Sequence, residues 1–86
     1  MEIDPDKKSV YRLRGMVNYI LGEFDNALED FNFAVDFEPE MATNYAMRAL
    51  IKYSLNDKNG ACLDWSKAGE LGYEKAYDEI KEKCND

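Results

Sequence analysis

The chain has 86 residues, of which 45% are hydrophobic and 34% charged, and its 18 acidic and 11 basic residues give a formal net charge of −7. This composition is typical of one small globular domain and not of a disordered or membrane-embedded chain. The acidic balance argues against nucleic-acid binding, and the absence of histidine excludes His-based triads and His-ligated zinc. We therefore expect no nucleic acid, no membrane insertion, no metal and no cofactor.

Apolar residues at helical spacing predict two helices in the first half of the chain. The first is predicted over residues 8–21, from a stripe made of Val10, Leu13, Val17, Ile20 and Leu21. Gly22 then supplies a left-handed C-terminal cap. The second is predicted over residues 24–37, from a stripe made of Ala27, Phe31, Ala34 and Val35, and Pro39 ends it.

Three further helices are predicted over residues 42–54, 58–70 and 73–84. Their apolar stripes consist of Met47, Leu50, Ile51 and Leu55; of Ala61, Cys62, Trp65, Ala68 and Leu71; and of Tyr73, Ala76, Tyr77, Ile80 and Cys84. Asn56 and Asp57 form a turn with an N-cap oxygen, and Gly72 ends the fourth helix. We expect an all-α fold of five helices, each antiparallel to its neighbours.

The sequence also repeats itself with a period of 34 residues. Among the residues that recur at this offset are Pro5 as Pro39, Tyr11 as Tyr45, Arg14 as Arg48, Tyr19 as Tyr53, Leu21 as Leu55, Ala27 as Ala61, Asp30 as Asp64 and Ala34 as Ala68. Their placement at helical spacings, with residues of similar size between them, indicates two copies of one helical hairpin.

These residues resemble the tetratricopeptide repeat (TPR) family, whose unit is a helix–turn–helix of about 34 residues. The resemblance rests on Tyr11, Gly15, Ala27, Phe31 and Pro39 in the first unit and on Tyr45, Ala49, Ala61 and Trp65 in the second. Two features depart from the family pattern. Arg14 and Arg48 stand where the family usually has Leu, and Gly72 with Tyr73 replaces the closing proline of the second unit.

The resemblance implies antiparallel helical hairpins stacked as a short right-handed α-solenoid. Repeats would cover residues 8–41 and 42–75, residues 76–86 would complete a C-terminal capping helix, and residues 1–7 would be the remnant of a preceding repeat. The implied function is a non-catalytic module that binds a protein or peptide segment in a concave groove. The alternative is a homo-oligomerisation or scaffold unit within a longer array, using the face that a missing upstream unit leaves uncovered.

Alignment to the family also implies which residues would line the groove. They are Ser9, Arg12, Met16, Tyr19 and Ile20 from the first unit and Thr43, Ala46, Leu50, Tyr53 and Ser54 from the second. This set would suit an extended or helical segment with an apolar anchor. A carboxylate clamp for chaperone tails is rejected because only Arg12 has the chemistry for it. Packing between units is the alternative for Met16, Tyr19 and Leu50.

Two pairs of opposite charges recur at equal spacing. Arg14 and Asp30 are 16 residues apart, as are Arg48 and Asp64, which predicts an ion pair across each hairpin. The alternative is that the two arginines bind an acidic ligand. Trp65 is predicted to lie in the core rather than to stack on a ligand.

Seven acidic residues and no basic residue lie between Arg14 and Arg48. They predict a solvated outer face or, alternatively, a patch that attracts a basic partner. Phe33 and Phe37 fall outside the buried stripe of their helix. They predict an exposed contact surface for a partner or for self-association, the alternative being a surface aromatic that its neighbours half cover.

The two cysteines are too few for a disulfide scaffold and are wrongly spaced for a metal site. Antiparallel helices should bring Cys62 and Cys84 within about 10 Å of each other. The sequence favours two reduced, buried thiols over a disulfide, and the cytoplasm over export, with both alternatives open. No nucleophile–base pair is spaced for catalysis and no glycine-rich phosphate loop is present, so we expect no enzyme.

Overall fold

The computed structural model describes residues 8–84, and over that range its regular secondary structure is all α-helix. Its five helices are α1 (Lys8–Ile20), α2 (Phe24–Phe37), α3 (Ala42–Ser54), α4 (Lys58–Glu70) and α5 (Lys75–Lys83). The predicted all-α fold is confirmed, and every predicted helix boundary falls within two residues of the observed one. Residues 1–7, interpreted as the remnant of a preceding repeat, lie outside the described residues.

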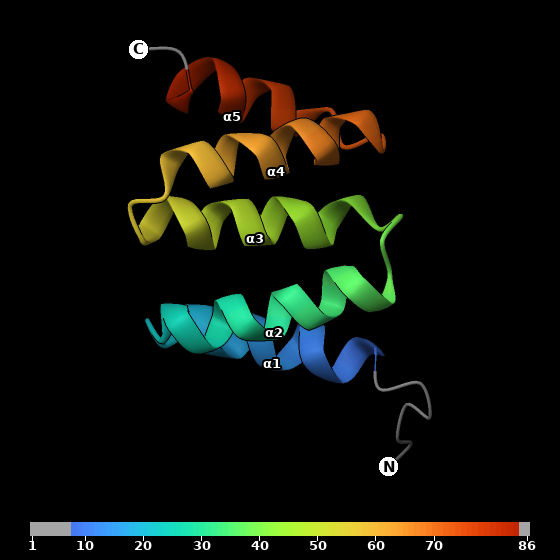
Figure 1. Ribbon diagram of the computed structural model, residues 1–86, viewed down its shortest axis with the longest axis vertical. Helices are drawn as coiled ribbons and strands as arrows, with labels where there is room; N and C mark the ends of the chain where they lie inside the picture. Colours follow the sequence, from blue (N-terminus) through green and yellow to red (C-terminus); the bar gives the residue numbers. More distant parts are fainter. Residues whose placement is uncertain (1–7, 85–86) are drawn as a thin grey trace.

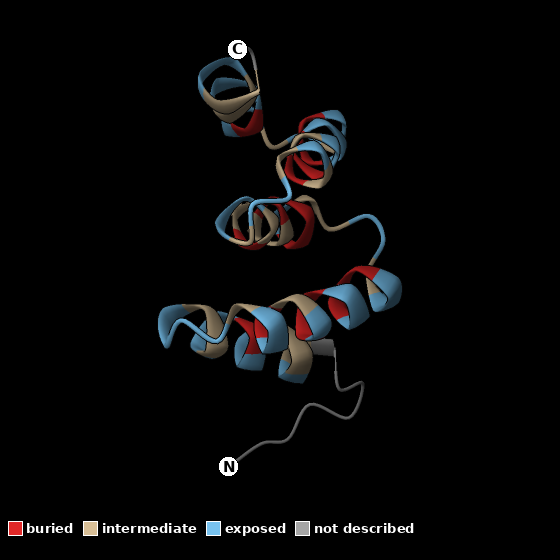
Figure 2. Ribbon diagram, turned by 60° about the vertical axis from the view of Figure 1, so that its left-hand side comes forward, coloured by how far each residue is buried: buried red, intermediate tan, exposed pale blue. Residues whose placement is uncertain are grey.

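The helices follow one another in a stack in which each runs antiparallel to the next (Figure 1). The pairs α1–α2 and α3–α4 form two hairpins, α2 packs against α3, and α5 packs against α4. The principal extents of 46 × 26 × 17 Å describe an elongated arrangement. Buried residues lie on the faces between neighbouring helices, and exposed ones line the outside (Figure 2).

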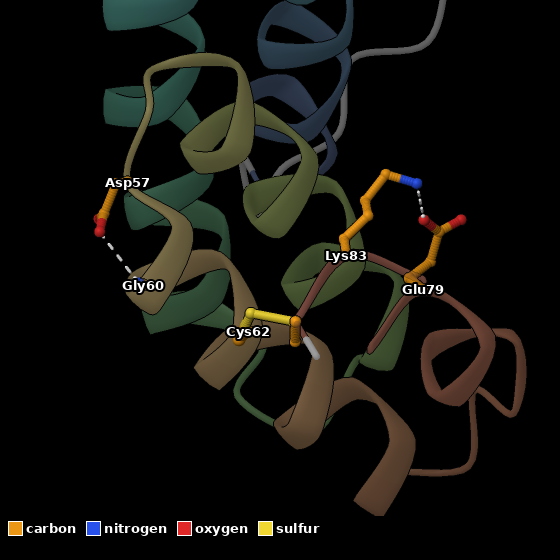
Figure 3. Close-up of a disulfide and its surroundings, with 6 residues drawn as sticks. Asp57, Gly60, Cys62, Glu79 and Lys83 are labelled. Carbon is orange, nitrogen blue, oxygen red and sulfur yellow. Dashed lines mark hydrogen bonds and ion pairs between the residues drawn. A yellow bond between two sulfur atoms is a disulfide. The ribbon is translucent and has the colours of Figure 1, made fainter. Parts of the chain in front are cut away.

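The turns depend on residues that adopt left-handed backbone conformations. Gly22 ends α1 with φ 79° and Gly72 ends α4 with φ 108°, as their sequence positions predict. Asn56, at the turn between α3 and α4, has φ 68°. Asp57 then caps α4, because its Oδ1 accepts a hydrogen bond of 3.0 Å from the Gly60 amide (Figure 3).

Two aromatic side chains organise the core. Phe31 packs with Ala27, Ala34 and Ile51, while Trp65 packs in a second cluster rich in alanine, with an exposed fraction of 1%. The predicted burial of Trp65 is confirmed. Alanine and glycine at the helix crossings let the backbones approach closely. A Cβ atom on Gly15 would lie 2.7 Å from the Phe31 ring, so α1 and α2 require glycine at that position.

A disulfide joins the start of α4 to the residue after α5. Cys62 and Cys84 are bonded, with their Cα atoms 6.0 Å apart (Figure 3). The predicted proximity is confirmed, but the preference for two reduced thiols is wrong. The antiparallel packing of α4 and α5 places the two Cα atoms inside the range that a disulfide spans, and periodicity alone does not define that distance.

Replacing Trp65 tests the core directly. Trp65→Ala should cost about 3–5 kcal/mol in the free energy of unfolding, because it leaves a large cavity among side chains that have little room to collapse. Leu63→Ala, on the exposed side of the same helix, should change that free energy by less than about 0.5 kcal/mol. Urea denaturation measures both. A loss below about 1 kcal/mol for Trp65→Ala would contradict this description of the core.

The disulfide should stabilise the fold by restricting the unfolded chain. Its cysteines are separated by 22 residues, for which loop closure predicts about 3 kcal/mol. Reductant should therefore lower the urea midpoint of the wild type but leave that of a Cys62→Ala/Cys84→Ala double variant unchanged. A wild type that is insensitive to reductant, with two free thiols by intact mass, would be the contrary result.

Candidate functional site

Each hairpin carries the ion pair that the sequence predicts. Arg14 donates to Asp30 from Nη2 at 2.8 Å and from Nε at 3.1 Å, and Asn18 donates to the same carboxylate at 2.9 Å. Arg48 donates to Asp64 from Nε at 2.7 Å and from Nη2 at 2.8 Å. Both predicted pairs are confirmed. The hydrogen bond to the aspartate is the main cause that raises the pKa of each arginine above its ordinary value.

The two arginines differ in how much of their side chain reaches solvent. Arg14 exposes 59% of its side chain, whereas Arg48 exposes only 17%. Arg48 is enclosed because α2 lies on its outer side, where Asn32 Oδ1 accepts a hydrogen bond of 3.0 Å from Arg48 Nη1. The two ion pairs therefore join their helices in the same way, but the Arg48 pair is more enclosed by neighbouring residues than the Arg14 pair.

The groove candidates on α1 divide into engaged and exposed side chains. Arg12 donates to Glu38 Oε1 at 3.1 Å and lies 3.6 Å from the sulfur of Met41. Tyr19 is half-buried, with its ring centroid 5.6 Å from that of Phe24. Ser9 is half-buried, and Met16 and Ile20 are exposed.

The groove candidates on α3 divide in the same way. Ala46 is buried, and Leu50 packs at the edge of the Trp65 cluster. Thr43, Tyr53 and Ser54 are exposed. The Tyr53 ring centroid lies 5.8 Å from that of Trp65, and Lys83 Nζ lies 5.9 Å from the Tyr53 centroid.

The groove candidate Tyr19 packs in a cluster that also contacts the end of α3, whereas the candidates on α3 itself pack in the other cluster or are exposed. Tyr19 of α1 and Leu55, next to the end of α3, both pack against the cluster around Phe31. The exposed side chains on the predicted groove side are therefore Met16 and Ile20 from α1 and Thr43, Tyr53 and Ser54 from α3.

Phe33 and Phe37 are exposed on α2, as predicted, but they are not isolated. Their ring centroids lie 4.9 Å and 5.5 Å from that of Tyr11 on α1. The three rings form one aromatic cluster at the edge of the first hairpin. The guanidinium carbon of Arg14 lies 5.4 Å from the centroid of the Tyr11 ring, next to this cluster.

The acidic residues between Arg14 and Arg48 do not act as one group. Asp30 is buried in its ion pair and Glu38 binds Arg12. The other five, Glu23, Asp25, Glu29, Asp36 and Glu40, are exposed. They are spread over α2 and its two flanking turns.

Periodicity predicted the apolar stripe on α1, but it did not predict that this stripe is exposed. Val10, Leu13, Val17, Ile20 and Leu21 form the stripe that predicted the helix, yet their exposed fractions run from 42% for Val10 to 78% for Ile20. We call these five residues the outer face of α1. The side of α1 that packs on α2 is the opposite one, with Gly15 facing Phe31. The helix thus has two apolar sides, and the sequence signal for the exposed one was the stripe itself.

No family model, no curated protein and no solved structure matches this chain. Within residues 8–84, none of the helices has the length and hydropathy to cross a bilayer. The same residues contain no cluster of three or more Cys, Asp or Glu side chains arranged to hold a metal ion.

The unequal exposure of the two arginines predicts unequal effects of removing their partners. Asp64→Ala leaves Arg48 and Lys52 without the carboxylate that both contact, in an enclosed site, and should cost about 3 kcal/mol in the free energy of unfolding. Asp30→Ala should cost less, because Arg14 is exposed enough to regain water. Urea denaturation at pH 7 measures both losses. A larger loss for Asp30→Ala than for Asp64→Ala would contradict the conclusion that the Arg48 site is the more enclosed one.

Proposed function

We propose that this chain is a non-catalytic protein-interaction module, a short TPR-like array that binds a peptide segment of another protein along α1 and α3. One observation carries the proposal. Apolar and aromatic side chains at positions that the TPR resemblance assigns to the groove, namely Met16, Ile20 and Tyr53, are exposed. Met16 and Ile20 lie one turn apart on α1, and exposed apolar side chains that lie close together are typical of binding surfaces.

The chemistry of this side favours an apolar anchor on the ligand. Arg12, the cation among the groove candidates, already binds Glu38. A carboxylate of the ligand would have to displace that pair, whereas an aliphatic or aromatic side chain gains contact area with Met16 and Tyr53. The expected ligand is therefore an extended or helical segment with an apolar residue at its centre.

The disulfide bears on two parts of the proposal, the non-catalytic role of the chain and its cellular location. Cys62 and Cys84 are the chain's only cysteines, and their bond removes the thiolate that a cysteine nucleophile needs. Disulfides of this kind persist in oxidising compartments. Of the two locations left open by the sequence, the bond favours export.

Peptide selection tests the groove. Peptides selected from a displayed random library on the wild-type chain should bind a Met16→Ala/Tyr53→Ala double variant at least about 10-fold more weakly, because both side chains provide contact area for the anchor. Fluorescence anisotropy measures the affinities. Tyr77→Ala is the matched control, since it removes an exposed tyrosine from α5, a helix that packs mainly on α4.

The control separates loss of the site from loss of the fold. Circular dichroism should show the same helix content for all variants. Undiminished binding by the double variant, or a larger loss for Tyr77→Ala, would place the site elsewhere.

A further inference from the structure

The outer face of α1 is a continuous apolar surface. At 3.6 residues per turn, Val10, Leu13, Val17, Ile20 and Leu21 fall within an arc of about 100°. All five are exposed. Single exposed apolar residues are ordinary, but a contiguous stripe along a whole helix marks a surface that another element covers.

The chain itself shows what covers the equivalent face of α3. The residues 34 positions after Val10, Leu13, Val17 and Leu21 are Asn44, Met47, Ile51 and Leu55. Ile51 is fully buried in the Phe31 cluster, against which Met47 and Leu55 also pack. Asn44 Nδ2 lies 3.4 Å from the carbonyl oxygen of Ala34, which it approaches as a donor. The element that covers this face is α2. Ser54, the counterpart of Ile20, is exposed and marks the edge of the contact.

The residues of α2 indicate which side chains a helix needs in order to cover such a face. Helix α2 presents alanine and phenylalanine to α3 and carries Asp25, Glu29, Asp30 and Asp36 but no basic residue. Asn32 accepts a hydrogen bond from Arg48 at 3.0 Å. The pKa of Arg48 is raised mainly by its hydrogen bond to Asp64, and the nearby charge of Asp36 raises it further. The covering helix thus sets a polar acceptor and a carboxylate beside the arginine.

Arg14 occupies the position of Arg48 on α1. It donates to Asp30 through Nε and Nη2, and no residue between 8 and 84 takes the place that Asn32 takes for Arg48. Its side chain is correspondingly more exposed. An apolar stripe with an exposed arginine at its edge is complementary to an apolar helix face flanked by acceptors.

We propose that the outer face of α1 binds an acidic amphipathic helix of another protein, in the manner in which α2 binds α3, with an amide or carboxylate oxygen beside Arg14. Ile20 belongs to both surfaces, whereas Met16 and Tyr53 belong to the groove side alone and Val17 belongs to the outer face alone. Variants at Met16, Tyr53 and Val17 therefore distinguish the two proposals. A second copy of the chain is a poorer occupant. Its α2 is already covered by its own α3, and its α1 carries arginines and no acidic residue.

The sequence of α2 supplies the probe. A fluorophore-labelled synthetic peptide with the sequence of residues 23–38 should bind the full chain saturably. Val17→Asp places a carboxylate in the middle of the outer face and should weaken binding at least about 10-fold. Leu63→Asp is the matched control, because it makes the same change at an exposed apolar residue of α4 and should leave the affinity unchanged. Circular dichroism should show that both variants keep their helices, since both side chains are exposed.

The other results each overturn the proposal. Absence of saturable binding to the wild type, or equal binding to Val17→Asp, would mean that the outer face does not accept this helix. Loss of the peptide by Met16→Ala/Tyr53→Ala but not by Val17→Asp would place it in the groove, which supports the proposed function alone. A wild-type dimer in sedimentation velocity that Val17→Asp dissociates would identify a second copy as the occupant.

Discussion

The structure depends on how closely the two helices of each hairpin approach. In the first hairpin Gly15 faces the ring of Phe31, and any side chain on Gly15 would collide with that ring. In the second, Ala49 and Trp65 are buried in one cluster. The small residue brings the helices together, the large ring fills the space around the crossing, and the Arg–Asp pair joins their polar edges. Everything presented to a partner is positioned by these two crossings, because they decide which side of each helix points outward.

The sequence predicted the features that recur in both hairpins and the residues that end the helices. It did not predict contacts or exposures that occur in one hairpin alone. The Arg–Asp pairs followed from a spacing repeated in both units, and the helix ends followed from Gly22, Gly72 and Asp57. The exposure of Val17 did not follow, because α1 has two apolar sides and periodicity does not say which one has a neighbour. The engagement of Arg12 by Glu38 joins residues 26 apart, a separation outside any local rule.

The two ends of the stack differ physically. At one end α5 packs on α4, buries Ala76 and is held by the bond between Cys62 and Cys84. Its remaining surface is largely charged. At the other end α1 has an apolar face that is covered by nothing in residues 8–84. The stack therefore has a charged surface at the α5 end and an exposed apolar surface at the α1 end. An additional helix would bury the most apolar area at the α1 end.

Residue-by-residue mapping tests this account most directly. The amide chemical shifts of the isotope-labelled full chain are followed while the peptide of residues 23–38 is added. The largest changes should run along residues 10–21, with Arg14 among them, while α4 and α5 should stay unchanged. Changes confined to α3, α4 and α5, or no changes up to millimolar peptide, would contradict the claim that the outer face of α1 is a docking surface.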